Sequence, residues 1–300
     1  MSIIKNVITV KRLKVGKDKI GATSYNSVFA VRSAHPNAFG TSQTRRTLAA
    51  FLGQESIMGR IGYGYGSEWH LLRQLGYHRT YLSQKVREVV GAQRVEWLDF
   101  VFSRENVPLR DDREFVGLEF IQDDQVQARW KSFWPQTGNA QNWDAVGRIY
   151  FGNTTEWSLV EAKGHIGEVE SKCGATSRVS QHLILSALER TSKAFGNCRQ
   201  PIENWFAPYY QYANRLAALY FLMRECVPAV KTRLLFICFY GENREGCECP
   251  QSEQEWLPAI QRITDWLGID KQSDLMQRVH YLFLRVNPAG IGIREKAGGG

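Results

Sequence analysis

The sequence has no run of 18 apolar residues, and its start, MSIIKNVITVKRLK, lacks the pattern of a cleavable secretory signal. Its six cysteines show no regular spacing, which excludes the usual disulfide frameworks and favours reduced thiols. Cys247 and Cys249 are close together, but no second pair of ligands accompanies them, so we expect a plain loop and not a zinc site. We therefore expect a cytoplasmic protein with no membrane partner.

Acidic residues are scarce before residue 110. Residues 1–110 contain 17 Lys and Arg against 7 Asp and Glu, whereas residues 111–300 contain 21 against 23, so the net charge of +8 originates in the first segment. A basic segment beside a near-neutral one is typical of proteins that bind polyanions, although a positive surface that only maintains solubility gives the same count. We predict a basic amino-terminal α+β region over 1–110 that contacts nucleic acid, and a second domain over 111–297.

Apolar periodicity predicts an alternation of helices and strands in the second segment. From residue 123 the expected order is helix, strand, strand, helix, helix, strand, helix, strand. This order predicts an α/β fold in which a mixed sheet has helices on both faces. The pattern assigns no third antiparallel strand beside the first two, and residues 67–90 are expected to form one or two helices. The expected helices are 123–133, 177–194, 209–226 and 253–267, and the expected strands are 145–151, 157–162, 233–240 and 279–286.

The two adjacent strands are separated by a turn signal, Gly152-Asn153-Thr154-Thr155. If Gly152-Asn153 is a two-residue turn, Asp144 lies opposite Glu161, whereas a four-residue loop places it opposite Lys163. In both registers Asp144, Glu161 and Lys163 share one face, because side chains alternate along a strand.

Two opposed carboxylates, with Cβ atoms about 4.5–5.5 Å apart, repel each other unless a cation lies between them. Mg²⁺ takes one or two carboxylates together with water, and the adjacent Lys163 can hold a water or stabilise charge on a phosphate. A cross-strand ion pair on the surface is the simpler alternative. We favour a site, because Glu161 and Lys163 follow the apolar pair Leu159-Val160, where charges are rarely placed without use.

Asp144 followed by Glu161-Ala162-Lys163 on the next strand resembles the PD-(D/E)XK nuclease superfamily, and the order of elements over residues 113–290 resembles it too. The resemblance implies a restriction-endonuclease-like fold and a Mg²⁺ cofactor that Mn²⁺ can replace. It implies Asp144, Glu161 and the carbonyl of Ala162 as metal ligands and Lys163 as the catalytic lysine. Trp143 stands where the family often has proline.

Relatives often place a further acidic ligand on the helix before the first strand. Glu119, Asp123 and Asp124 are the candidates here, although capping of the helix explains the two aspartates equally well. Some relatives also place a glutamine near the lysine, and Gln181 lies at a comparable position. His165 and Glu168 follow the lysine closely enough to contact a substrate, but solvated loop residues fit the pattern better.

The expected function is a metal-dependent nuclease that hydrolyses phosphodiester bonds, with DNA as the first substrate to consider. The alternatives are a nucleic-acid-binding protein that keeps the fold without catalysis, and a hydrolase of small phosphate esters. The choice of DNA or RNA, the position of cleavage and a homodimer that cuts both strands are left open by the sequence.

Overall fold

The computed structural model describes residues 66–98, 115–136, 141–197 and 199–286. The strands are β1 (Arg94–Trp97), β2 (Phe115–Val116), β3 (Asn142–Trp143), β4 (Ala145–Phe151), β5 (Thr154–Lys163), β6 (Thr232–Tyr240) and β7 (Val279–Arg285). The α-helices are α2 (Ser67–Tyr77), α3 (Arg79–Val90), α4 (Asp124–Phe133), α5 (Arg178–Ala194), α6 (Tyr210–Tyr220) and α7 (Glu253–Leu267). A single π-helical turn, η3 (Phe221–Glu225), continues α6. Three short 3₁₀ helices complete the described elements: η1 (Ile166–Val169), η2 (Ile202–Trp205) and η4 (Met276–Arg278).

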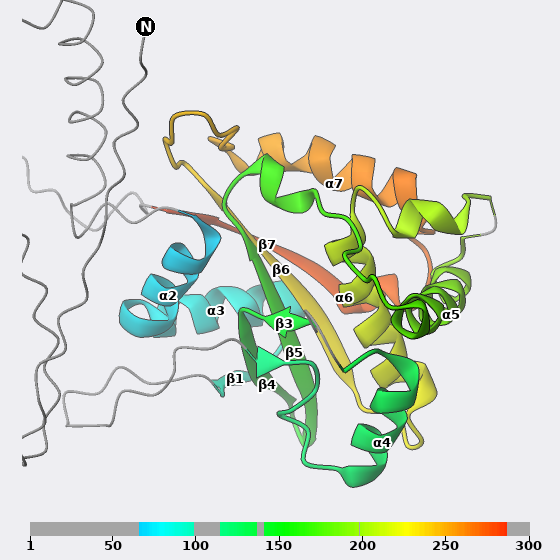
Figure 1. The fold of residues 1–300 in the computed structure, drawn as a ribbon. Helices are drawn as coiled ribbons and strands as arrows, with labels where there is room; N and C mark the ends of the chain where they lie inside the picture. The colour runs from blue at the N-terminus through cyan, green and yellow to red at the C-terminus, as the bar shows by residue number, and fades with distance from the viewer. Residues whose placement is uncertain (1–65, 99–114, 137–140, 198, 287–300) are drawn as a thin grey trace, which may run out of the picture. The chain divides into compact units, whose positions relative to one another are not determined.

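The main sheet is mixed and has the strand order β1-β4-β5-β6-β7 (Figure 1). β4 pairs antiparallel with both β1 and β5, whereas β5, β6 and β7 run parallel to one another. β2 and β3 form a separate two-stranded sheet. The predicted α/β class with a mixed sheet between helices is confirmed.

The hairpin between β4 and β5 has the shorter of the two predicted turns. Phe151 pairs with Thr154, so Gly152 and Asn153 alone form the turn. Gly152 has φ +56°, a left-handed conformation that glycine adopts without the steric cost of a side chain. The resulting register ends with Ala145 opposite Val160, and it fixes which face each later side chain of β5 occupies.

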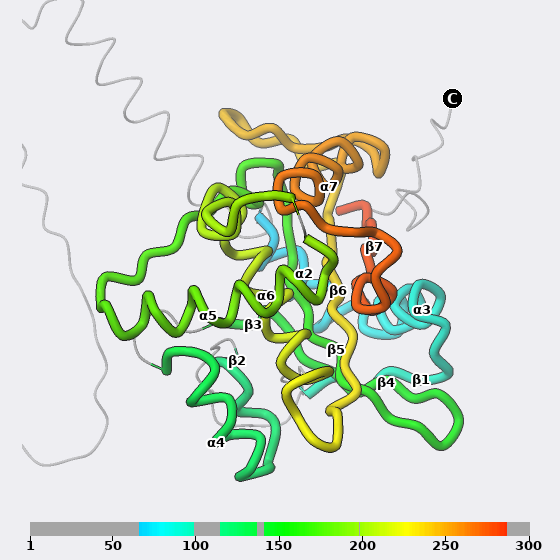
Figure 2. The backbone as a smooth tube through the Cα atoms, turned by 90° about the vertical axis from the view of Figure 1, so that its right-hand side faces the viewer, coloured from blue at the N-terminus to red at the C-terminus, as the bar shows by residue number. Residues whose placement is uncertain are grey.

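The two faces of β5 pack against different helices. Leu159 belongs to the core formed with α5, α6 and α7, whereas Val160 and Ala162 belong to the core formed with α2 and α3. Figure 2 shows α5 and α6 on one side of the sheet and α3 on the other. Because strand side chains alternate, Glu161 and Lys163 lie on the face that α6 covers.

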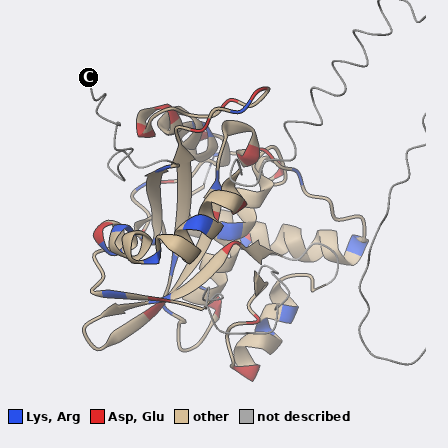
Figure 3. Cartoon of the chain, turned by 90° about the vertical axis from the view of Figure 1, so that its left-hand side faces the viewer, with Lys and Arg blue, Asp and Glu red and all other residues tan. Residues whose placement is uncertain are grey.

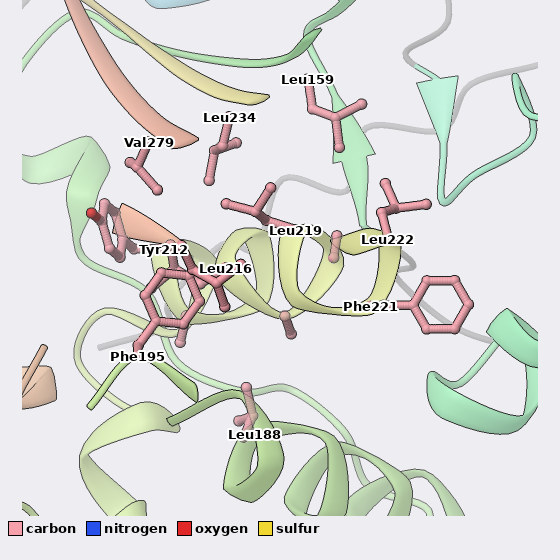
Figure 4. Packing of buried hydrophobic residues seen from close by; sticks show 14 of the residues in the cluster. Leu159, Leu188, Phe195, Tyr212, Leu216, Leu219, Phe221, Leu222, Leu234 and Val279 are labelled. Carbon is pink, nitrogen blue, oxygen red and sulfur yellow. The ribbon is translucent and has the colours of Figure 1, made fainter. Parts of the chain in front are cut away.

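Helix α6 lies between the sheet and α5. Leu219 points from α6 toward Leu159 and Leu234 of the sheet, Leu216 belongs to the same core, and Leu188 of α5 lies on the opposite side of the helix (Figure 4). All five side chains are fully buried. The apolar stripe of this helix therefore belongs to the hydrophobic core. Its packing fixes the position of the polar residues of α6 relative to β5.

The segment before residue 110 contributes to this fold. β1 is the third antiparallel strand and pairs with β4, while Leu71, Leu82 and Val86 of α2 and α3 are buried against the sheet. Residues 66–98, which we assigned to the amino-terminal region, thus share a core with β4, β5, β6 and β7. The rest of the expected amino-terminal region, residues 1–65 and 99–110, lies outside the described residues.

Charge is balanced over the part of the chain that the structure describes. It contains 23 Lys and Arg against 22 Asp and Glu, and Figure 3 shows the two signs interspersed along the elements. The excess of basic residues predicted to contact polyanions thus belongs almost entirely to residues outside the described ranges. No helix among the described residues is long and apolar enough to cross a membrane.

Candidate active site

The end of the β4–β5 ladder places Asp144 beside Glu161. Ala145 pairs with Val160, so Asp144 is the next residue and lies opposite Glu161. Its N–H donates to the carbonyl of Val160 at 3.2 Å, and its Oδ2 accepts from the N–H of Ala162 at 2.6 Å. These two bonds extend the pairing by one residue and fix the carboxylate at the sheet.

Lys163 completes the predicted group of three on the same face. Its Nζ donates to Oε1 of Glu161 at 2.5 Å and to Oε1 of Gln211 at 2.9 Å. Glu161 is 2% exposed and the side chain of Lys163 is 12% exposed, so the pair is shielded from bulk water. The structure therefore brings Asp144, Glu161 and Lys163 together, as the sequence pattern predicted.

Two further side chains come from α6 and were not predicted. Arg215 donates from Nε to Oε2 of Glu161 at 2.8 Å, its Nη2 forms an ion pair with the same oxygen at 2.8 Å, and Gln211 accepts from Lys163. Arg215 is 4% exposed in a helix whose neighbouring residues are core. A charge within an apolar helical stripe was the available signal, because such charges are almost always paired.

The Asp144 carboxyl is hard to ionise. Its burial raises the pKa of Asp144, and repulsion from Glu161 raises it further, to about 8. The hydrogen bond from Ala162 and the nearby charges of Lys163 and Arg215 act in the opposite direction but are weaker.

The Glu161 carboxylate behaves differently although it is more deeply buried. Burial alone would raise its pKa, but Arg215 and Lys163 outweigh that effect, so the pKa of Glu161 lies below its ordinary value. The pKa values of these two neighbouring carboxyls are thus shifted in opposite directions, because both cations pair with Glu161.

A polar cleft of about 840 Å³ opens beside Asp144. Arg215 and Gln211 also line it, and Asp144 is its only acidic residue among those described. Glu161 and Lys163 instead border a void of about 20 Å³ under Trp256 and Tyr281. The other residues that line the cleft are Trp134, Pro135, Asn142, Ser171, Lys172, Gly174, Ala175, Thr176, Ser177, Ser180, Ile184, Tyr210 and Asn214.

The three candidates for a further acidic ligand do not reach this cleft. Asp123 caps α4, since its Oδ1 accepts from the N–H groups of Gln125 and Val126 at 2.9 and 3.0 Å. Glu119 accepts from the N–H of Val116 at 2.9 Å, and Asp124 is exposed in the first turn of α4. The capping role that we gave as the alternative for the aspartates is the one that Asp123 has.

The glutamine beside the lysine is also not the predicted one. Gln181 is exposed and donates to the carbonyl of Ala175 at 2.9 Å. Glu168 accepts from the N–H of Gly164 at 2.7 Å, and His165 lies 3.4 Å from Glu168, so these two residues stabilise the turn after β5. Sequence spacing could not distinguish the two glutamines, because the choice depends on how α5 and α6 pack.

The donor set agrees in kind with Mg²⁺, which prefers oxygen ligands. Oδ1 of Asp144 has no hydrogen-bond partner among the described residues, and the carbonyl of Ala162 faces the same strand edge as its N–H. Both oxygens of Glu161 already carry cations, so a metal would have to replace one of them. No cluster of three Asp, Glu, His or Cys residues that could hold a metal exists within the described ranges.

Comparisons with protein-family models, curated proteins and solved structures found no match to this chain.

Proposed function

We propose that this protein is a Mg²⁺-dependent nuclease of the PD-(D/E)XK type with a restriction-endonuclease-like core, and that its substrate is DNA. The observation that carries the proposal is the placement of Asp144, Glu161 and Lys163 on one sheet face, at the end of an antiparallel pair and next to a polar cleft. A mixed sheet in which such a pair adjoins parallel strands supports it.

The cleft has the chemistry of a phosphodiester site. Apart from Asp144, its charged lining residues among those described are the cations Arg215 and Lys172, and its remaining polar residues are hydroxyls and amides. Such groups are the common partners of phosphate oxygens. The basic residues before position 66 would add contacts to the backbone, so the affinity for nucleic acid should fall steeply with salt.

In the proposed mechanism, Asp144, Glu161 and the carbonyl of Ala162 would hold the cation. When bound, Mg²⁺ supplies a Lewis acid that activates water and neutralises charge on the reacting phosphate. Lys163 orients the attacking water or stabilises charge on the phosphate, and Gln211 keeps its Nζ at a fixed position. The cleft walls keep the phosphodiester next to Asp144.

The test is incubation of the purified chain with labelled single- and double-stranded DNA and RNA in Mg²⁺ or Mn²⁺, with EDTA as control. Cleavage that requires the metal and disappears in Asp144→Asn supports the proposal. Absence of cleavage on all four substrates, or cleavage that persists in the variant, contradicts it.

One observation favours a second candidate, a nucleic-acid-binding protein without catalysis. Arg215 and Lys163 together neutralise Glu161, and a guanidinium on that carboxylate can replace a metal structurally. This candidate predicts salt-dependent binding of nucleic acid, unchanged by EDTA, with no cleavage in either metal.

A further inference from the structure

Arg215 is held at the site by three different contacts. Its Nε and Nη2 bind Oε2 of Glu161 at 2.8 Å, and its Nη1 donates to Oδ1 of Asn214 at 2.8 Å. The guanidinium also lies 4.9 Å from the centre of the Trp143 ring. These contacts hold the guanidinium against one oxygen of Glu161 and leave it without the two-oxygen fork that guanidinium groups form with carboxylates and phosphates.

The acids of the site are already matched by bases without a metal. Lys163 and Arg215 both pair with Glu161, and Asp144 is a second acid beside them. A divalent cation would add two positive charges to a shielded place where charges interact strongly. The cation can enter favourably only if a basic group moves away or an anion arrives with it.

Arg215 is the basic group positioned to move. Its side chain lines the large cleft together with Asp144, whereas Lys163 borders the small void behind it and is also held by Gln211. A guanidinium that leaves Glu161 on the cleft side meets the place where a phosphodiester would lie.

We propose that Arg215 and the catalytic cation compete for Glu161, and that Arg215 transfers to a phosphodiester oxygen in the cleft when the cation binds. This inference rests on the proposed nuclease function for the identity of the cation and the anion. It makes Arg215 a substrate-binding residue. It also predicts that the protein binds the cation more tightly when the phosphodiester is bound, and the reverse, because the phosphodiester accepts the arginine that the cation displaces.

The test measures the dissociation constant of Mn²⁺ by electron paramagnetic resonance, with and without the dinucleotide TpT, which has one phosphodiester. Arg215→Met should bind Mn²⁺ alone about tenfold to a hundredfold more tightly than the wild type, the range expected when a charged hydrogen-bonding competitor is lost. TpT should strengthen Mn²⁺ binding in the wild type and have little effect in this variant.

Two variants isolate the cause. Arg215→Lys keeps the positive charge, so its Mn²⁺ affinity should stay near that of the wild type. Arg190→Met removes a half-exposed arginine that pairs with Glu225 on α5 and η3, and it should change neither quantity. Tightening in Arg215→Lys equal to that in Arg215→Met would overturn the charge argument.

An unchanged or weaker Mn²⁺ affinity in a folded Arg215→Met protein overturns the inference. If thermal melting shows that this variant does not fold, the test uses the wild type alone. Equal Mn²⁺ affinity of the wild type with and without TpT also overturns the inference. The nuclease proposal is tested separately. Tighter Mn²⁺ binding in Arg215→Met without cleavage by the wild type would support this inference and contradict the nuclease proposal. Cleavage by the wild type without tighter Mn²⁺ binding in Arg215→Met would support the nuclease proposal and contradict this inference.

Discussion

The backbone N–H of Ala162 donates a hydrogen bond of 2.6 Å to the Asp144 carboxylate. Asp144 lies just before the first residue of β4, so this bond joins a side chain, and not a backbone carbonyl, to β5. It holds the carboxylate beside Glu161 and at the cleft, and the carbonyl of Ala162 faces the same strand edge as its N–H. This contact thus brings the Asp144 carboxylate to the edge where we propose that the other two metal ligands lie.

Asp144→Asn should abolish cleavage without unfolding the protein. The amide oxygen of asparagine can still accept the bond from Ala162, whereas the negative charge needed for a cation is lost. We expect cleavage of labelled DNA in Mg²⁺ to fall at least about a hundredfold, since even groups that only support a metal ligand cost this much when removed. The melting temperature in EDTA should stay at or above that of the wild type, because Asp144 is hard to ionise. Full activity would remove Asp144 from the mechanism.

Glu161 should be tested as Glu161→Gln, because Glu161→Ala confounds catalysis with stability. Alanine leaves Arg215 and Lys163 buried without their shared carboxylate, and loss of one partner of a buried ion pair costs about 3–5 kcal/mol. We expect urea unfolding to show a loss of this size for Glu161→Ala and a smaller one for Glu161→Gln. Equal stability of the alanine variant and the wild type would show that the pairing is energetically neutral.

Gln211→Leu should lower the rate of cleavage about tenfold while leaving the fold intact. A tenfold loss is the low end of the range observed when a group that supports a metal site is removed. The substitution removes one acceptor of Lys163 Nζ, so the amine is held only by Glu161. Gln181→Leu is the matched control, since Gln181 is exposed and bonds to its own loop. A larger effect from Gln181 than from Gln211 would return the role to the residue expected from the sequence.

The stability of the sheet should depend on pH through His280. Burial, together with the charges of Arg233 and Arg278, lowers the pKa of His280 from 6.5 to about 4 against the attraction of Glu156. Between these pH values the unfolded chain binds a proton that the folded chain does not, so the stability that neutral His280 contributes is lost as the pH falls from 6.5 toward 4.

His280→Gln removes this proton and keeps an acceptor near Arg233, whose Nη1 lies 3.0 Å from Nε2 of His280. Urea unfolding of the wild type and the variant across pH 4–7 is the measurement. The stability of the variant relative to the wild type should rise as the pH falls. A constant difference over this range would contradict the lowered pKa.

Local patterns predicted most of the elements and half of the site. α7 has the bounds expected from its apolar spacing, and α5 begins one residue later than expected. The Gly152-Asn153 turn and strand alternation placed Asp144, Glu161 and Lys163 on one face, because a hairpin register depends only on neighbouring residues. Two registers remained open from the sequence, since both loop lengths fit the same turn residues.

Tertiary packing decided what lies around those three residues. Arg215 and Gln211 reach Glu161 and Lys163 only because α6 packs over β5, more than 40 residues away in the chain. β1 becomes the third antiparallel strand for the same kind of reason: its four residues carry too little periodicity to reveal a partner more than 40 residues distant. Periodicity encodes which face of an element is buried, whereas the identity of the opposing element follows from the packing of the whole core.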